Sequence, residues 1–140
     1  MEKQKLQNVA LKQIHIQDEF WNKYVNLVDD VIIPFQWELI NDNVEGAEKS
    51  YCIRNFRIVN GDIEGEHQGM VFQDTDVAKW LEAVGFALNY ERDEKLEALA
   101  DETIELIGRA QQPDGYFKTE ERAISAINKE IEALQKSDTY

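Results

Sequence analysis

The sequence lacks the features of secreted proteins, membrane-spanning proteins and proteins with metal clusters. It has one cysteine, Cys52, so neither an intrachain disulfide nor a site with several cysteine ligands can form within the chain. It has no run of about 18 apolar residues, which argues against a membrane-spanning helix. The first seven residues, Met-Glu-Lys-Gln-Lys-Leu-Gln, contain no apolar segment. No secretory signal is therefore expected, and the expected location is the cytoplasm.

Basic residues are also few. The chain has 15 Lys and Arg against 28 Asp and Glu, which gives a formal net charge of -13. Nucleic-acid binding relies on cationic side chains that neutralise phosphates, so this charge argues against a nucleic-acid partner. It argues equally against an anionic membrane surface. A neutral ligand and a basic partner are both compatible with the charge, which does not choose between them.

The composition is that of a folded globular protein. Hydrophobic residues make up 43% of the 140 residues and aromatic residues 10%. A chain of this length fits one domain and can bury roughly two-thirds of its unfolded surface. Within such a core, Cys52 is interpreted as a small apolar residue rather than as a reactive thiolate. A thiolate would need a base or a cation beside it, and Arg54 is only a weak indication of one.

Helical periodicity begins after a short lead-in. Residues 13–17 alternate between polar and apolar, which is typical of a short strand or an extended segment. Asp18 is expected to cap a helix, because apolar residues follow it at helical spacing through residues 20–32. Pro34 interrupts the pattern and is expected either to kink this helix or to start a new one over residues 35–40.

A polar connection separates these helices from the next one. Residues 41–50 are predicted to form a loop, and residues 51–59 a short helix with apolar positions 53, 56 and 59. Gly61 is expected to end that helix in a left-handed conformation. A glycine-rich loop is predicted to follow over residues 61–71.

The clearest helical pattern lies in residues 74–110. Apolar residues cover most of the circumference of 77–90, whereas 96–110 carry one apolar stripe opposed by acids. This contrast predicts an αα-hairpin with an inner and an outer helix. Pro-Asp-Gly marks a turn within 111–116. A last amphipathic helix is predicted in 120–136, so the expected fold class is all-α.

Chemically useful side chains gather at two junctions between loops and helices. Asp74 or Thr75 is expected to cap the inner helix by accepting its free N–H groups. Asp76 in the first turn also suits the helix dipole. Neither reason explains Gln73, which lies beside them.

The second junction follows the outer helix, at the same end of the predicted hairpin. Gln111, Asp114 and Tyr116 are therefore expected to share a rim with Gln73 and Asp74. Amides, carboxylates and aromatic rings on one rim suit a polyhydroxylated ligand, because a sugar offers hydroxyls for hydrogen bonds and a flat face for stacking.

Four motifs in this order resemble the β-L-arabinofuranosidase family (glycoside hydrolase family 127). They are Val31 to Asp42, Asn55-Phe56-Arg57 with Gly61, Gly69 to Ala83, and Asp101 to Thr119. The resemblance covers residues 14–119. Two positions depart from it, because the family typically has serine where Thr75 stands and tyrosine where Ala78 stands.

The resemblance implies a fold and a reaction. It implies an (α/α)6 barrel of antiparallel helical hairpins with a sugar pocket at one end, and removal of terminal β-L-arabinofuranose with retention of configuration. It also implies a zinc-bound cysteine nucleophile and a glutamate acid/base, both downstream of the motifs found here. Residues 1–119 are therefore expected to be the N-terminal portion of such a truncated barrel, with no catalytic residue or zinc ligand. Residues 120–140 lie outside the resemblance.

Seven residues are carried over by their motif positions as candidate contacts to an L-arabinofuranosyl or related sugar: Gln36, Trp37, Phe72, Asp74, Asp76, Lys79 and Trp80. This chain alone is expected to be inactive. Two further interpretations stay open. One is a helical module that binds a carbohydrate or a protein, or associates with itself through the apolar surface of an incomplete barrel. The other is a scaffold without any ligand.

Overall fold

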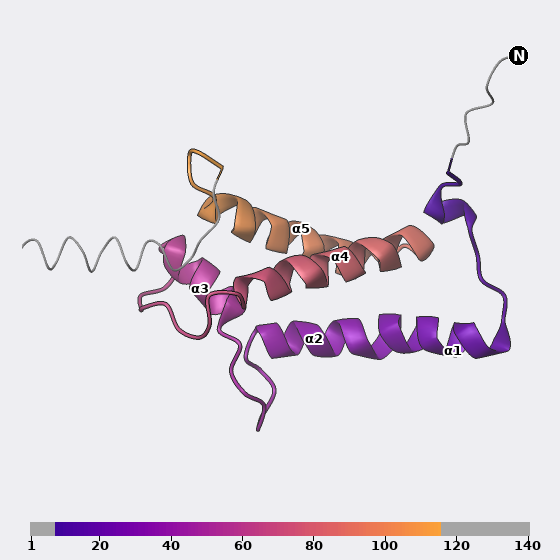
Figure 1. Ribbon diagram of the computed structural model, residues 1–140, viewed down its shortest axis with the longest axis horizontal. Helices are drawn as coiled ribbons and strands as arrows, with labels where there is room; N and C mark the ends of the chain where they lie inside the picture. Colours follow the sequence, from indigo (N-terminus) through magenta and orange to yellow (C-terminus); the bar gives the residue numbers. More distant parts are fainter. Residues whose placement is uncertain (1–7, 116–140) are drawn as a thin grey trace, which may run out of the picture.

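The computed structural model describes residues 8–115, which contain helices and connecting loops (Figure 1). The all-α fold class is confirmed for these residues. The helix predicted over 120–136 lies outside them. A short 3-10 turn, η1 (Leu11–Gln13), precedes extended backbone at residues 14–18. Of the two alternatives for residues 13–17, the extended lead-in is therefore the one observed.

The first helices form one continuous rod (Figure 1). It consists of α1 (Glu19–Leu27), a π-helical turn η2 (Val28–Ile32) and α2 (Ile33–Ile40). Asp18 caps α1 as predicted, because its carboxylate accepts hydrogen bonds from Phe20 N and Trp21 N, each 2.9 Å long. Pro34 lies in the first turn of α2, where its missing N–H costs little. The proline thus lies at the start of a helical segment that continues the rod.

The short helix α3 (Cys52–Val59) lies at one end of the molecule (Figure 1). Gly61 follows it with a left-handed φ of 75°, as predicted for the residue that ends the helix. The buried Asn55 fixes the glycine-rich loop, because its Nδ2 donates to Gln68 O at 2.8 Å and its Oδ1 accepts from Gln68 N at 3.2 Å. This loop leads the chain from α3 into the hairpin.

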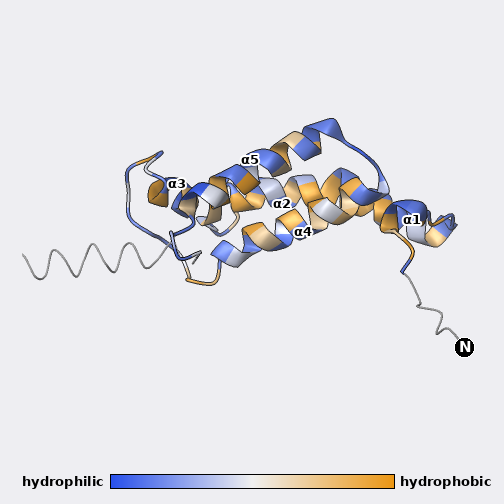
Figure 2. Ribbon diagram, turned by 90° about the horizontal axis from the view of Figure 1, so that it is seen from above, coloured by the Kyte–Doolittle hydropathy of each residue, from blue (hydrophilic) through white to orange (hydrophobic). Residues whose placement is uncertain are grey.

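The hairpin predicted from periodicity is confirmed as α4 (Asp74–Tyr90) and α5 (Glu94–Ala110). The inner helix α4 packs against α2, α3 and α5. Figure 2 shows that α5 carries hydrophilic segments between its apolar ones, as expected for a helix with one wet face. The covering of α4 is nevertheless incomplete within residues 8–115, because Phe86 is 58% exposed.

Buried residues from four helices form one core. Its central side chains are Ile33 of α2, Ile53 and Phe56 of α3, and Val77 and Val84 of α4, each at most 5% exposed. At its edge, a bidentate ion pair joins the start of the glycine-rich loop to the last turn of α5. Both Arg109 nitrogens lie 2.8 Å from the carboxylate oxygens of Asp62.

The predicted cap of α4 is wrong. Neither Asp74 nor Thr75 caps this helix, and residue 73, at the N-cap position, already has helical backbone angles. The amides of the first turn are bonded to backbone instead, since Thr75 N donates to Phe72 O and Asp76 N to Gln73 O. The Thr75 hydroxyl donates to Phe72 O at 2.7 Å. The turn before α4 thus runs directly into the helix, and the N–H groups of Thr75 and Asp76 already have backbone acceptors.

The length and apolar character that a membrane crossing requires are found in none of the helices within residues 8–115.

Two isoleucines test the position of the core. Ile33 is 1% exposed, so replacing it by Ala leaves a cavity in the core. This substitution should lower the free energy of unfolding by about 2–5 kcal/mol. The matched control Ile104→Ala, on the wet face of α5 at 57% exposure, should change it by less than about 0.5 kcal/mol. Urea unfolding followed by circular dichroism measures both. Equal losses in the two variants would contradict this packing.

Candidate functional site

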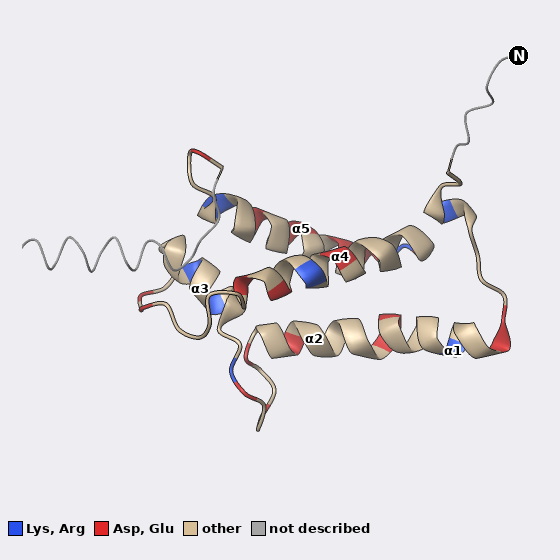
Figure 3. Ribbon diagram, viewed as in Figure 1, with Lys and Arg blue, Asp and Glu red and all other residues tan. Residues whose placement is uncertain are grey.

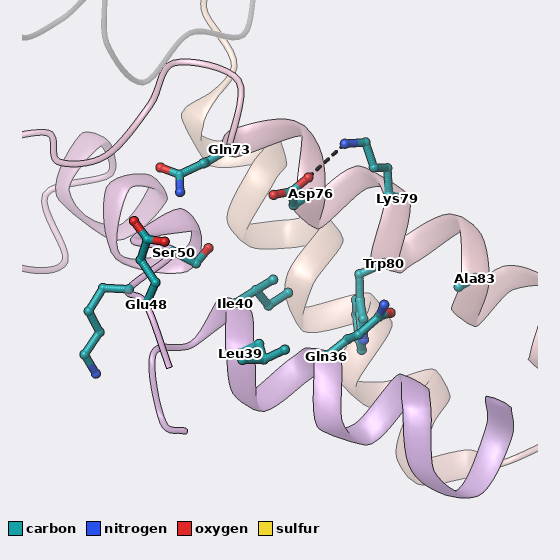
Figure 4. A pocket seen from close by; sticks show the side chains of 11 residues that line it. Gln36, Leu39, Ile40, Glu48, Ser50, Gln73, Asp76, Lys79, Trp80 and Ala83 are labelled. Atoms are coloured by element: carbon teal, nitrogen blue, oxygen red, sulfur yellow. Dashed lines mark hydrogen bonds and ion pairs between the residues drawn. The ribbon is translucent and has the colours of Figure 1, made fainter. Parts of the chain in front are cut away.

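A cleft of about 580 Å³ opens between α2, the start of α4 and the loop that precedes α3 (Figure 4). Eleven residues line it: Gln36, Leu39, Ile40, Glu48, Lys49, Ser50, Gln73, Asp76, Lys79, Trp80 and Ala83. Glu48, Ser50 and Gln73 lie at one end of the view in Figure 4, whereas Gln36, Trp80 and Ala83 lie towards the other.

Helical spacing builds two of the walls. On α4, Asp76, Lys79 and Ala83 are three and four residues apart, so they lie on one face of the helix. On α2, Gln36 and Ile40 are four residues apart and share a face in the same way. The cleft thus has two rigid walls whose side chains are fixed in direction by the helices that carry them.

Trp80 holds the two walls together. Its Nε1 donates a buried hydrogen bond of 3.1 Å to the carbonyl oxygen of Ile33. Its ring lies against that of Trp37, with centroids 4.6 Å apart and planes inclined by 38°. Because its N–H is already used and only 2% of the residue is exposed, Trp80 shapes the wall of the cleft and has little surface to offer a ligand.

The charged groups of the cleft are accessible to water. Lys79 Nζ lies 2.8 Å from Asp76 Oδ1, and the two side chains are 68% and 43% exposed. An ion pair this exposed contributes little to stability, so a ligand can displace it at small cost. Figure 3 shows acidic and basic segments along α4. The cleft therefore offers both hydrogen-bond donors and carboxylate acceptors.

Four of the seven residues predicted for a sugar site line this cleft: Gln36, Asp76, Lys79 and Trp80. The other three do not line it. Trp37 lies against Trp80, Phe72 is 62% exposed in the turn before α4, and Asp74 occupies the first position of that helix. For all seven residues, contact with a sugar stays a prediction.

The predicted shared rim is only partly described. The start of α4 and the end of α5 lie at the same end of the molecule (Figure 1). Gln73 lines the cleft, while the Gln111 amide donates to Gly115 O at 2.9 Å and so closes its own turn. Tyr116 lies outside the described residues. The rim stays a prediction.

Sequence reasoning missed the contribution of the loop before α3. Glu48, Lys49 and Ser50 line the cleft, although residues 41–50 were expected only to connect two helices. A loop has no periodicity that would indicate which of its side chains face a site. The available signal was position, because this loop lies between two of the motifs that carry the family resemblance.

Cys52 follows this loop, is buried, and has an unreactive thiol. Its Sγ accepts a hydrogen bond from Ser50 Oγ at 2.6 Å and donates one to Gln73 O at 2.8 Å. The pKa of the thiol is raised to about 11, chiefly by burial and to a smaller extent by nearby carboxylates such as Asp76, while the hydrogen bond from Ser50 opposes the rise. Cys52 is thus protonated at neutral pH and is not a nucleophile.

Within residues 8–115, no three His, Cys, Asp or Glu side chains converge in a way that could hold a metal ion.

The chain matches a family model over residues 13–137, that of the β-L-arabinofuranosidase, GH127 catalytic domain. This range continues beyond residue 119 into the segment that the resemblance did not reach. The boundary between residues 1–119 and 120–140 stays a prediction.

A curated relative and two solved structures are similar to the chain. The non-reducing end β-L-arabinofuranosidase of Bifidobacterium longum subsp. longum is 38% identical over 118 residues, which are 76% of this chain and 18% of that protein. A solved GH127 β-L-arabinofuranosidase from Geobacillus stearothermophilus T6 is 56% identical with a TM-score of 0.73, over 75% of this chain and 16% of the other. A second solved GH127 β-arabinofuranosidase is 26% identical with a TM-score of 0.67, over 79% and 17%. The chain therefore spans less than a fifth of the length of these relatives.

The thiol of Cys52 gives a pH test of the site. Its folded pKa of about 11 lies above the ordinary thiol value of about 8.5, so the folded state holds this proton more tightly. The resulting stability is fully present below the unfolded pKa and is lost as the pH rises through the folded pKa. The free energy of unfolding should therefore fall between about pH 9 and 11 more steeply in the wild type than in Cys52→Ala. Denaturant unfolding at several pH values measures this dependence. If the free energy of unfolding changed with pH equally in the two proteins, the raised pKa would be contradicted.

Proposed function

The chain belongs to the GH127 β-L-arabinofuranosidase family, and from this premise we propose that its cleft forms one wall of a pocket for an arabinofuranosyl sugar. The helices around the cleft are correspondingly part of an (α/α)6 barrel. The observation that carries the proposal is the convergence of Gln36, Asp76, Lys79 and Trp80 on one cleft from two separate motifs. The cytoplasmic location stays a prediction.

The chemistry of the cleft suits a small polyhydroxylated ligand. The amide of Gln36 can donate to one sugar hydroxyl and accept from another, and the exposed Asp76–Lys79 pair offers an acceptor beside a donor. Trp80 is 2% exposed, so it shapes the wall of the cleft rather than offering a face on which a sugar ring could stack. The volume of about 580 Å³ falls within the range of small-molecule sites. The net charge of -13 further favours a neutral ligand over an anionic one.

Hydrolysis requires groups that the described residues do not supply. The family resemblance implies a zinc-bound cysteine nucleophile, but the only cysteine here, Cys52, is buried, protonated and bonded to Ser50 and Gln73 O. These residues do not fit a zinc centre. We therefore assign the cleft residues to sugar binding, and no catalytic step to any of them.

Sugar binding can be followed by tryptophan fluorescence. In a Trp21→Phe background the signal comes from Trp37 and Trp80, since the remaining tryptophan, 56% exposed on α1, is removed. Titration with methyl β-L-arabinofuranoside should change this signal saturably. Gln36→Ala should weaken the affinity about tenfold, because one lost hydrogen-bonding side chain is worth on the order of 1.4 kcal/mol.

The exposed Gln17, outside the cleft, provides the matched control. Gln17→Ala should bind as the parent does, and the chain alone should not hydrolyse a chromogenic β-L-arabinofuranoside. Absence of any saturable response would overturn the sugar-binding proposal. Robust hydrolysis by the 140-residue chain would overturn the assignment of catalysis to other groups.

The exposed apolar side chains of the rod favour a second candidate function, which is association with another protein surface. Large hydrophobic side chains between 37% and 56% exposed lie along most of its length: Phe20, Trp21, Tyr24, Leu27, Val28, Val31, Ile32 and Phe35. Apolar patches of this extent mark interaction surfaces in soluble proteins. We propose that the rod binds either a second copy of the chain or further helices of a barrel.

Light scattering tests the association. At concentrations of tens of micromolar, the mass should exceed the 16.3 kDa of one chain. Val31→Lys, which places a charge on the rod at a residue 53% exposed, should shift the mass towards that of the monomer. The matched variant Ile104→Lys, at similar exposure on α5, should leave it unchanged. A wild-type monomer that binds no hydrophobic dye would contradict the proposal.

A further inference from the structure

The loop that brings Glu48, Lys49 and Ser50 to the cleft begins and ends in a left-handed conformation. Asp42 has φ 63° and Tyr51 has φ 59°, and they are the only non-glycine residues within residues 8–115 with positive φ. This conformation costs an L-residue roughly 1–2 kcal/mol, and it persists where surrounding contacts enforce it. The contacts at the base of the loop are therefore expected to be strong.

One side chain closes the base of this loop. The Asp42 carboxylate accepts hydrogen bonds from Ser50 N at 2.7 Å and from Tyr51 N at 3.1 Å. Lys49 Nζ also donates to the backbone carbonyl of Asp42. Hydrogen bonds to an ionised carboxylate are stronger than those to a neutral acceptor. Asp42 thus joins the first and last residues of the loop.

The loop is joined in turn to the start of α4. The Ser50 hydroxyl donates to Cys52 Sγ, and the thiol donates to Gln73 O. The Gln73 side chain is itself fixed, because its Oε1 accepts from Met70 N at 2.6 Å. A Cβ on Gly69 would come within 2.2 Å of that oxygen, so the turn packs closely around it. A continuous chain of hydrogen bonds therefore runs from Asp42 to the turn before α4.

Side chains of this loop and of Gln73 lie between two hollows. The cleft of about 580 Å³ adjoins a second hollow of about 340 Å³, and Glu48, Lys49 and Gln73 line both. The second hollow is completed by Tyr51, Gly69 and Met70. Figure 4 shows Glu48 and Gln73 at one end of the cleft. A shift of the loop would change the shape of both at once.

We propose that Asp42 is a positioning residue for ligand binding, which holds Glu48, Lys49 and Ser50 at the cleft although its carboxylate does not line it. The inference rests on the proposed function, because it supposes that the cleft binds a sugar. The carboxylate of Asp42 fixes the loop through Ser50 and Tyr51, and Cys52 transmits that position to Gln73. The wall opposite the two helices is thus set by a tether rather than by secondary structure.

Two substitutions separate the tether from the backbone strain. Asp42→Gly removes the carboxylate but adopts positive φ freely, so any loss it causes is not due to strain. Asp42→Asn keeps one acceptor oxygen and also tolerates the left-handed conformation. Asp93→Gly is the matched control, because Asp93 likewise accepts from two backbone amides, Lys95 N and Leu96 N, and does not line the cleft.

The first measurement is the rate at which the buried Cys52 reacts with a thiol reagent under native conditions. Asp42→Gly should raise this rate at least about tenfold, since release of the loop exposes the thiol beneath it. Asp42→Asn should stay within about threefold of the wild type. Asp93→Gly should lower the free energy of unfolding without raising the rate at which Cys52 reacts. If Asp42→Gly does not fold, Ser50→Ala gives the second test, and by cutting the link to Cys52 it should also raise the rate.

The second measurement is the affinity for methyl β-L-arabinofuranoside, which Asp42→Gly should weaken about tenfold and Asp42→Asn should preserve. Unchanged thiol reactivity in Asp42→Gly would overturn the proposal, and so would faster labelling with unaltered sugar affinity. A wild-type chain that shows no sugar response, while its labelling still depends on Asp42, would instead overturn the proposed function and leave a tether without a ligand-binding role.

Discussion

The hydrogen bond from the Trp80 indole to the Ile33 carbonyl is the contact on which the rest of the structure depends. It joins the rod to the hairpin across 47 residues of sequence and is buried, so no water can replace it. A buried indole N–H without a partner would be costly, and this cost fixes the approach of the two helices. The Trp37 ring lies against the Trp80 ring, with the two planes inclined by 38°. The spacing of the two helical walls of the cleft follows from this one arrangement.

The third wall is positioned by a different physical means. Residues 42–51 form no regular structure, and the loop takes its shape from Asp42 and from the links through Ser50 and Cys52. Helical walls need no such tether, because periodic backbone hydrogen bonds already fix their side chains. A site built from two rigid walls and one tethered loop can keep its helices while its ligand preference changes with the loop.

The sequence predicted the helices better than it predicted the site. Periodicity and the Asp18 cap are local signals, so the rod, the short helix and the hairpin could be located from residue patterns alone. The capping prediction for Asp74 and Thr75 was wrong because the preceding turn had already taken the helical angles, which no side-chain pattern shows. Gln36 and Lys79 were placed at the cleft through family resemblance. The role of Asp42 depends on contacts eight and nine residues away and could not be found by periodicity.

Cys52 shows why residue type alone does not assign a function. A nucleophilic cysteine needs a cation or a metal that favours its thiolate, whereas Cys52 is buried with carboxylates nearby that oppose ionisation. Ionisation would also remove the proton that the thiol donates to Gln73 O and would break the link between the loop and α4. Burial, with a smaller contribution from the nearby carboxylates, makes this thiol a poor nucleophile and thus preserves it as a hydrogen-bond donor. Cys52 thus has a structural role. While the thiol keeps its proton it is unreactive, and the same proton forms the hydrogen bond to Gln73 O that links the loop to α4.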